Sequence, residues 1–307
     1  ILRTRVIVVD AEDEIGLGED HECIAVLDDD APVGGAAKNY FHEEEDTVLE
    51  IDLTPNRIDG ASHIGVARDL VAYLRQSEDI ELKKPSVQHL KKDDDNLKID
   101  VEIVNPEACP RYSGVALTNV RVQPSPEWLQ NRLKAVGLNP INNLVDISNF
   151  VLLETGQPLH FFDADKIKDG KVVIQKLKEG NSFTSLDEEK INLSSEDLMI
   201  CDTEKPMCIA GVLGGANSGV TENTTNLFIE SAYFEPRHIR NTAKRHGLNT
   251  DASYRFERGA DPNNTVYALK RAALMVKEIA GGNISSDIVD EYPDPIERAP
   301  VDLNFDN

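Results

Sequence analysis

Three clusters of polar residues in this 307-residue sequence combine side-chain types that could bind or transform a ligand. The first lies between residues 142 and 163, where amide, hydroxyl, carboxyl and imidazole groups are interspersed with apolar residues. It includes Ser148, Asn149 and His160. Polar groups in such surroundings must bond to one another, to the backbone or to a ligand. Capping of helices and turns explains the cluster without a ligand, and it is the commoner outcome.

The second cluster is the glycine-rich segment Ala210-Gly211-Val212-Leu213-Gly214-Gly215. Glycines let a ligand approach the backbone closely and leave N–H groups free to donate. The segment lacks the spacing of a phosphate loop and that of a dinucleotide-binding fingerprint. Taken alone, it favours a hairpin turn over a binding loop.

The third cluster begins at Glu230, at the end of an apolar run, and extends past Ala252. Residues 237–246 within it are the strongest concentration of positive charge in the sequence. Such side chains could bind phosphate groups. The usual meaning of a charged run is instead a solvated helix face. The cationic residues that we single out are Arg237, Arg240, Lys244 and Arg245.

The sequence does not favour covalent catalysis by a serine. Asp163 follows His160 at a distance of three residues, but Ser148 lacks the sequence context of a nucleophile elbow. A charge-relay hydrolase is therefore disfavoured.

The cysteines carry no redox or metal-binding signature. They form no CxxC pair, and the separation of Cys201 and Cys208 fits no familiar zinc-ligand pattern. We therefore expect no metal site, and we expect buried free thiols in the reducing environment of the cytoplasm. The four cysteines are Cys23, Cys109, Cys201 and Cys208.

Composition narrows the classes of function. The formal net charge of −23 argues against broad, unspecific nucleic-acid binding and disfavours a stand-alone DNA-binding protein, but it permits a local basic patch. No run approaches the roughly 20 apolar residues that a membrane helix needs, so we expect no membrane association.

The elements that must position these residues follow from hydrophobic periodicity. Alternation predicts strands, and apolar residues at helical spacing predict helices that begin at Ser62 and Ser125, plus a late helix ended by Gly281. Strands and helices mix without βαβ alternation, which indicates an α+β fold with mixed or antiparallel sheets and packed helices. The expected strands are 48–53, 97–103, 115–122, 172–177, 207–213, with a turn at Gly214-Gly215, and 227–231.

Two composition shifts divide the chain. Residues 76–96 are rich in Lys, Asp and Glu and predict a linker or exposed loop. Prolines from residue 293 onward mark a second linker. We expect a small N-terminal α+β module in residues 1–90, a larger domain in residues 91–292, and the start of a further module in residues 293–307.

Several ordered motifs together carry a family resemblance over roughly residues 45–290. The chain resembles the β subunit of bacterial phenylalanyl-tRNA synthetase, and residues 91–292 are similar to its editing domain. By the same resemblance, residues 1–90 hold the end of a tRNA-binding-like segment and the first module. The motifs are IDLTPNR at 51–57, IGVAR at 64–68, SPEWL at 125–129, PINNLVD at 140–146, GQPLH at 156–160, ESA at 230–232, LNTDAS at 248–253 and RFERG at 255–259.

The resemblance implies an α2β2 phenylalanine–tRNA ligase of the cytoplasm. Its partners are the α subunit and the tRNA for phenylalanine. The aminoacylation site, with ATP and magnesium, belongs to the α subunit, so no cofactor is expected in this chain. The editing domain of the β subunit hydrolyses tyrosine that has been wrongly esterified to the tRNA.

The resemblance also assigns residues to the editing site. It implies catalytic roles for His160, Glu230 and Thr250. It places Asn149, Gly214 and Ala252 in the substrate pocket, and we add Ser148 and Gly215 as candidates for substrate contacts. The cationic residues singled out above are our candidates for tRNA contacts.

The physical chemistry of the task agrees with this assignment. Phenylalanine and tyrosine differ by one hydroxyl, and a pocket that hydrogen-bonds this hydroxyl rejects the molecule lacking it. Glu230 is our candidate for that contact, while Gly214 and Ala252 leave room for the ring. Backbone N–H groups of Gly214 and Gly215 could stabilise the oxyanion. We expect a positioned water to attack, with no covalent nucleophile.

One departure from the family keeps a second interpretation open. Asn139 stands where the family often has an arginine, next to Pro140. The alternative is a non-catalytic scaffold that holds the tRNA and the α subunit around an inactive pocket.

Overall fold

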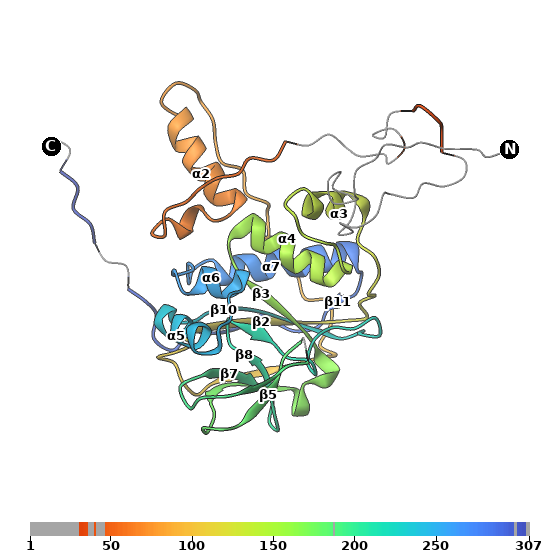
Figure 1. Cartoon of the computed structure of the whole chain (residues 1–307), viewed down its shortest axis with the longest axis vertical. Helices are drawn as coiled ribbons and strands as arrows, with labels where there is room; N and C mark the ends of the chain where they lie inside the picture. The colour runs from red at the N-terminus through yellow and green to blue at the C-terminus, as the bar shows by residue number, and fades with distance from the viewer. Residues whose placement is uncertain (1–30, 36–39, 41–46, 187, 298–299, 305–307) are drawn as a thin grey trace.

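The computed structural model describes residues 31–35, 40, 47–186, 188–297 and 300–304. Cys23 lies outside the described residues, and so does most of the predicted tRNA-binding-like segment. The described residues form three layers, with helices on one side, a central sheet in the middle and an outer sheet on the other side (Figure 1).

The central sheet is antiparallel and runs in the order β11-β2-β10-β3, with β12 also paired to β2. Its middle strand β10 is buried along nearly its whole length, because both faces of the sheet are covered. The strands are β2 (Arg111–Thr118), β3 (Leu159–Asp163), β10 (Leu227–Tyr233), β11 (Asn283–Ile284) and β12 (Val289–Glu291).

The outer sheet is mixed, in the order β1-β4-β7-β8-β9, because β1 and β4 are parallel while the other pairs are antiparallel. A short hairpin of β5 (Ser182–Thr184) and β6 (Lys190–Asn192) lies beside it. The strands of the outer sheet are β1 (Asp100–Ile103), β4 (Lys171–Lys176), β7 (Leu198–Cys201), β8 (Pro206–Ile209) and β9 (Leu213–Gly214).

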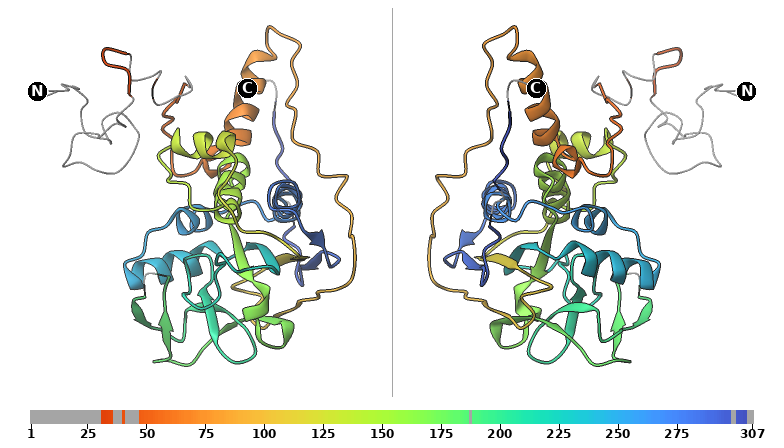
Figure 2. Two further views of the ribbon diagram at one scale, coloured as in Figure 1. Left: turned by 90° about the vertical axis from the view of Figure 1, so that its right-hand side faces the viewer. Right: turned by 90° about the vertical axis from the view of Figure 1, so that its left-hand side faces the viewer.

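Helices α4 (Asn143–Thr155) and α7 (Thr265–Ile279) cover the face of the central sheet opposite the outer sheet. Helix α3 (Glu127–Lys134) packs on α4, and α2 (His63–Leu74) touches α4 from outside the layers. Figure 2 shows α2 standing clear of the sheets, with the chain that follows it running down the outside of the body. The other helices are α5 (Pro236–His246), α6 (Asp251–Phe256), η1 (Ile58–Gly60), η2 (Ala164–Lys166) and η3 (Lys168–Gly170).

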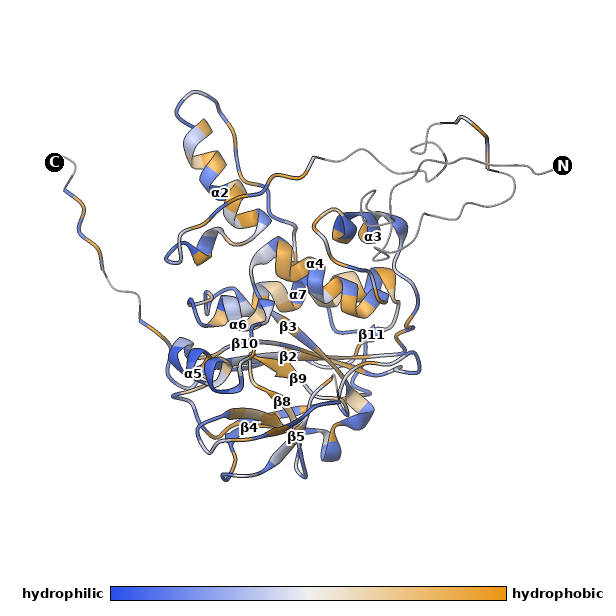
Figure 3. Cartoon of the chain, viewed as in Figure 1, coloured by the Kyte–Doolittle hydropathy of each residue, from blue (hydrophilic) through white to orange (hydrophobic). Residues whose placement is uncertain are grey.

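The two faces of the central sheet have separate cores. Alternate residues of a strand point to opposite faces, so Ile229 packs with the helices while Phe228 packs between the sheets. The apolar strands and inner helix faces stand out in Figure 3 against hydrophilic loops. Polar residues of β3 and β10 that share the face of Phe228 therefore point toward the outer sheet.

The α+β fold with mixed and antiparallel sheets is confirmed, and so are several elements. Ser62 caps α2 by accepting a hydrogen bond from the Gly65 N–H at 2.9 Å. The late helix α7 ends just before Gly281, and β4 and β10 lie where strand-like runs predicted them. Residues 76–96 form neither helix nor strand. The domain boundaries at 90 and 292 stay predictions.

Two predicted elements are wrong in their details. Residues 48–53 form no strand, because no described strand lies beside them to pair with, and they remain exposed or only partly covered. The helix predicted to begin at Ser125 is α3, which begins at Glu127. Ser125 does not cap it, because its hydroxyl donates to the Asp146 carboxylate at 2.6 Å. Trp128 is 48% exposed, so it does not belong to the inner face of that helix.

The glycine-rich segment also differs from its prediction. Instead of one strand closed by Gly214-Gly215, β8 ends at Ile209 and β9 follows after a tight turn. Gly211 occupies this turn with a φ of +67°, a conformation that side chains with a Cβ rarely adopt. Gly214 is a strand residue.

We predict that Gly114→Ala destabilises the fold by about 1–3 kcal/mol, the usual cost of overpacking a core. A Cβ at position 114 of β2 would lie 2.3 Å from Cζ of Phe228, in the core between the sheets. Urea unfolding measures the effect. Gly219→Ala is the control, because its Cβ would meet nothing nearer than 3.6 Å. Equal unfolding midpoints for the two variants would contradict the prediction.

Candidate functional site

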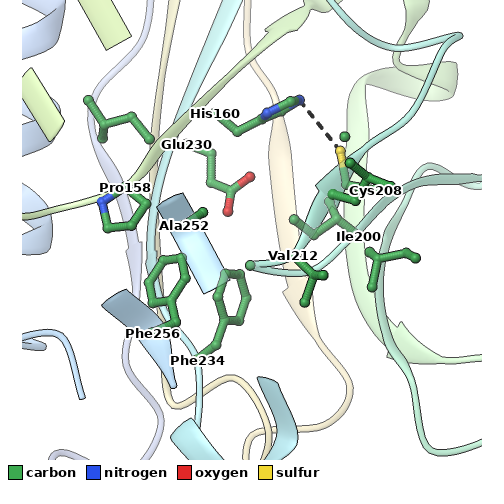
Figure 4. A pocket seen from close by; sticks show the side chains of 14 residues that line it. Pro158, His160, Ile200, Cys208, Val212, Glu230, Phe234, Ala252 and Phe256 are labelled. Atoms are coloured by element: carbon green, nitrogen blue, oxygen red, sulfur yellow. Dashed lines mark hydrogen bonds between the residues drawn. The ribbon is translucent and has the colours of Figure 1, made fainter. Parts of the chain in front are cut away.

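A cavity of about 90 Å³ opens between the two sheets, close to α6. Figure 4 shows the Glu230 carboxyl group directed into it, with His160 and Cys208 on one side and two phenylalanines on the other. Most of the wall is apolar, as expected for a pocket that binds an uncharged group. The lining residues are Pro158, Leu159, His160, Ile200, Cys208, Ile209, Gly211, Val212, Leu213, Gly214, Glu230, Phe234, Ala252 and Phe256.

Strand register brings the two titratable groups of the cavity together. His160 on β3 and Glu230 on β10 are directly opposite each other in the antiparallel ladder. Directly opposed residues place their side chains on the same face of a sheet. That face looks toward β8 and β9 of the outer sheet, so both side chains enter the space between the sheets.

Glu230 is neutral at pH 7. The residue is 5% exposed, and burial raises the pKa of its carboxyl from 4.5 to about 8. The neighbouring Tyr112 hydroxyl acts in the opposite direction, to a smaller extent. Within the described part of the chain, Oε2 of Glu230 has no hydrogen-bond partner. A protonated carboxyl can both donate and accept, so this group is ready to bond a ligand hydroxyl.

His160 is also neutral at pH 7. Its ring sits in the wall deeply enough that burial lowers its pKa from 6.5 to about 4. Nε2 lies 3.5 Å from Sγ of Cys208, and the ring packs edge-on against Phe162 at a centroid distance of 4.4 Å. Since neither Glu230 nor His160 is charged, the inner part of the cavity suits a neutral aromatic or aliphatic group.

Close approach of the backbone gives the cavity its shape. A Cβ on Gly214 would lie 3.0 Å from Cε1 of His160 and 2.9 Å from Cδ1 of Leu186. A Cβ on Gly211 would collide with Phe234 and other side chains behind the turn. Any larger residue at position 214 must displace the imidazole, so the glycine keeps this wall thin.

Helix α6 contributes Ala252 to the wall, and Thr250 fixes that helix in place. The Thr250 hydroxyl accepts from the Ser253 N–H at 3.1 Å and donates to the Val212 carbonyl at 2.9 Å. Thr250 thus ties α6 to the turn between β8 and β9, and it does not line the cavity. Its predicted catalytic role has no direct geometric support.

The structure does not bring Ser148, Asn149 or Gly215 into the cavity. Ser148 and Asn149 belong to α4, which packs on the opposite face of the central sheet, and the Ser148 hydroxyl donates to the Val145 carbonyl at 2.7 Å. Gly215 lines a neighbouring hollow of about 140 Å³ with Phe183. These residues were chosen from their places in the sequence, but strand direction and helix packing decide which face they reach.

The cationic residues all lie on α5, whose outer face is hydrophilic (Figure 3). Arg237, Arg240 and Lys244 are exposed. Arg245 has a side chain that is 35% exposed, but it pairs with Asp197, a fully buried carboxylate that also accepts from His246 at 2.7 Å. Arg245 therefore anchors the helix, while the other three remain accessible to a polyanion.

Cys208, Phe234 and Phe256 belong to the cavity but were not predicted as site residues. Nothing in their local sequence distinguishes them from core residues, and their roles depend on contacts between distant segments. Cys109, Cys201 and Cys208 are buried free thiols, as expected. Over the described ranges, no group of three His, Cys, Asp or Glu residues could hold a metal ion, and no helix is long and apolar enough to cross a membrane.

We predict that the buried Glu230 makes folding stability fall as pH rises. In the folded state the Glu230 carboxyl keeps its proton up to about pH 8, whereas in the unfolded state it loses this proton near pH 4.5. The free energy of unfolding should therefore drop by about 1.4 kcal/mol per pH unit above pH 6.5 and level off beyond pH 8, or roughly 2 kcal/mol in all. Urea unfolding at several pH values measures it.

Glu230→Gln is the matched control for this titration, because its amide keeps the size and neutrality of the protonated carboxyl. Both proteins contain His160, so its contribution cancels in the difference between them. The difference between wild type and Glu230→Gln then reports Glu230 alone. A pH-independent difference would show that the carboxyl is ionised in the fold.

Comparisons with known proteins point to one family. The B3/4 domain family matches residues 108–281. A phenylalanine–tRNA ligase beta subunit of Bacteroides fragilis is 54% identical over 96% of this chain and 36% of its own length. The beta subunit of Salinibacter ruber is 46% identical over 96% of this chain and 36% of its own length. That of Bdellovibrio bacteriovorus is 44% identical over 95% of this chain and 35% of its own length.

Solved structures also match. Among them is an N-terminal fragment of the phenylalanyl-tRNA synthetase beta subunit from Pyrococcus horikoshii, with 17% identity and a TM-score of 0.42, covering 76% of this chain and 60% of that chain. The chain spans only about a third of the length of the curated relatives it matches, 36% in the Bacteroides fragilis case.

Proposed function

The chain belongs to the B3/4 domain family, and from this premise we propose that its cavity hydrolyses tyrosine wrongly esterified to the tRNA for phenylalanine. The resemblance to bacterial phenylalanyl-tRNA synthetase β subunits that the motifs carry is confirmed by relatives up to 57% identical over 96% of the chain. The proposal concerns the activity of this part of such a subunit.

The observation that carries the proposal is the neutral, unpaired carboxyl of Glu230 inside an apolar cavity. A phenolic hydroxyl that enters gives the carboxyl group a hydrogen-bond partner. Phenylalanine would leave the carboxyl unpaired and desolvated, which costs about 1–3 kcal/mol. Sites that hydrogen-bond a substrate hydroxyl discriminate against the molecule without it by up to about 10⁴-fold or more.

The size and polarity of the cavity favour a ring that enters end-on. Its volume of about 90 Å³ is smaller than the closed cavity of about 150 Å³ that houses benzene. The hydroxyl end of a tyrosine ring therefore reaches Glu230, between Phe234 and Phe256, while the rest of the ring extends into the mouth. The charged amino group and the ester stay outside the neutral interior, where water reaches them.

Hydrolysis by water fits the groups around the mouth. The nucleophilic side chain in the wall is Cys208, and burial raises the pKa of its thiol well above its usual range, so it stays protonated and unreactive. His160 is neutral and can hydrogen-bond the ester or a water. Gly214 leaves backbone exposed beside the imidazole, which suits close approach of the ester carbonyl.

The rest of the proposed function rests on what the family resemblance implies. We propose that the full-length subunit works with an α subunit in an α2β2 enzyme of the cytoplasm, where ATP and magnesium act at the α subunit. The three exposed cations of α5 offer a binding surface for the tRNA backbone on an otherwise acidic chain.

A scaffold without editing activity is the alternative. It is favoured by the position of Asn149 on α4 and of Thr250 behind the wall, since these two assigned site residues, like Ser148 and Gly215, do not line the cavity. In that case the cavity would be inactive, and the chain would only support tRNA binding and assembly.

We predict that Glu230→Ala slows deacylation of tyrosyl-tRNA for phenylalanine by at least about tenfold in the complete enzyme, because the hydroxyl loses its hydrogen bond. Glu230→Gln should keep much of the activity, since an amide also donates and accepts. Exposed Glu222→Ala is the control. Release of labelled tyrosine is measured. Unchanged rates in Glu230→Ala refute the role of Glu230, and an inactive wild type supports the scaffold.

We predict that the double variant Arg237→Ala, Lys244→Ala weakens tRNA binding and makes it less sensitive to salt. For every phosphate that the protein no longer neutralises, the slope of log affinity against log salt should fall by about 1. Filter binding at several salt concentrations measures this. Exposed Lys190→Ala on β6 is the control, because it removes a cation on another element. An unchanged slope would show that α5 does not bind the tRNA.

A further inference from the structure

The thiol of Cys208 faces the cavity, and the proposed hydrolysis gives it no task. Cys208 lies on β8 of the outer sheet and His160 on β3 of the central sheet, 48 residues apart in sequence. Their side chains meet across the gap between the sheets, with Sγ 3.5 Å from Nε2 (Figure 4). Within the described ranges, this is the hydrogen bond that the imidazole makes.

The imidazole is held in one orientation. The ring of Phe162 packs against it edge-on at 4.4 Å. Cε1 lies next to the Gly214 backbone, close enough that a Cβ there would be only 3.0 Å away. Because ring rotation would disturb both contacts, Nε2 stays directed at the thiol, and Nδ1 is the nitrogen left for a ligand.

The direction of the hydrogen bond follows from the chemistry of the two groups. A neutral imidazole has one N–H donor and one accepting nitrogen, and a thiol donates weakly and accepts weakly. The ring nitrogen that carries no proton is a good acceptor, whereas sulfur is a weak one. The S–H group is therefore better placed to give its proton to Nε2 than to accept one from it.

We propose that Cys208 is a positioning residue: its S–H donates to Nε2 of His160 and holds the ring in the tautomer that carries the proton on Nδ1. His160 then offers a ligand an N–H donor and no basic nitrogen. Its contribution to hydrolysis is to orient the ester or the water, and not to remove a proton. This consequence rests on the proposed editing function, whereas the tautomer itself does not.

The tautomer can be observed without any substrate. Two-bond ¹H–¹⁵N correlation spectra of the ¹⁵N-labelled 307-residue chain distinguish a protonated Nδ1 from a protonated Nε2. We expect Nδ1–H in wild type and in Cys208→Ser, whose hydroxyl is a stronger donor. Cys208→Ala should shift the population toward Nε2–H. A wild-type ring protonated at Nε2, or an Nδ1–H ring in Cys208→Ala, would overturn the proposal.

Deacylation of tyrosyl-tRNA by the complete enzyme tests the consequence. We expect Cys208→Ala to lower kcat by roughly tenfold or more with little change in KM, because a misplaced imidazole proton can cost up to about 10⁴-fold. Cys208→Ser should restore kcat. Cys201→Ala is the control, since this buried thiol on β7 does not line the cavity. A Cys208→Ala enzyme with wild-type kcat would refute the positioning role.

The two experiments separate the proposals. If wild type does not deacylate the substrate but shows Nδ1–H, the editing function fails and the tautomer assignment stands. If wild type is active and its ring is protonated at Nε2, editing stands and the assignment fails.

Discussion

The site depends on the burial of a carboxyl group between two sheets. Ionising Glu230 where it lies would cost about 5 kcal/mol, the equivalent of a pKa rise from 4.5 to about 8. The side chain stays neutral instead, provided that its neighbours are neutral too. The uncharged imidazole of His160 and the protonated thiol of Cys208 meet this condition. A single ammonium or guanidinium group in the wall would ionise the carboxyl and remove its ability to donate.

This arrangement separates two kinds of recognition in space. In the proposed function, a neutral donor and acceptor inside the apolar cavity discriminates by the presence of one hydroxyl. Outside it, the exposed cations of α5 face water, where long-range attraction to a polyanion needs no close fit. Because α5 is anchored through Arg245 and the buried Asp197, the cations are held at a fixed position on the body that contains the cavity.

The central sheet decides which side chains share the cavity. Its two faces carry independent cores, one under the helices and one under the outer sheet. Residues on α4 are therefore separated from the cavity by the thickness of a sheet, even though Asn149 lies only eleven positions before His160. The order of motifs in the sequence does not show this separation, because the chain turns between α4 and β3 and passes from the helix layer into the sheet.

Local pattern by itself determined a large part of the architecture. The helical spacing of 266–280, the Ser62 cap and the apolar run before Glu230 depend on neighbours within a few residues, so α7, α2 and β10 could be predicted. The glycines and Glu230 also marked the site by residue type. The start of α3 and the loop at 48–53 could not be predicted, because Asp146 and the pairing of strands compete with local propensity.

Only the tertiary structure decided which of the candidate residues meet. Glu230 and His160 face each other because β10 pairs with β3 in one register, and a shift of one residue would send either side chain to the opposite face. The contact of Cys208 with His160 exists because two sheets pack face to face. Such contacts join segments that are distant in the sequence, and they form only when whole layers pack together. No local sequence pattern can therefore specify them.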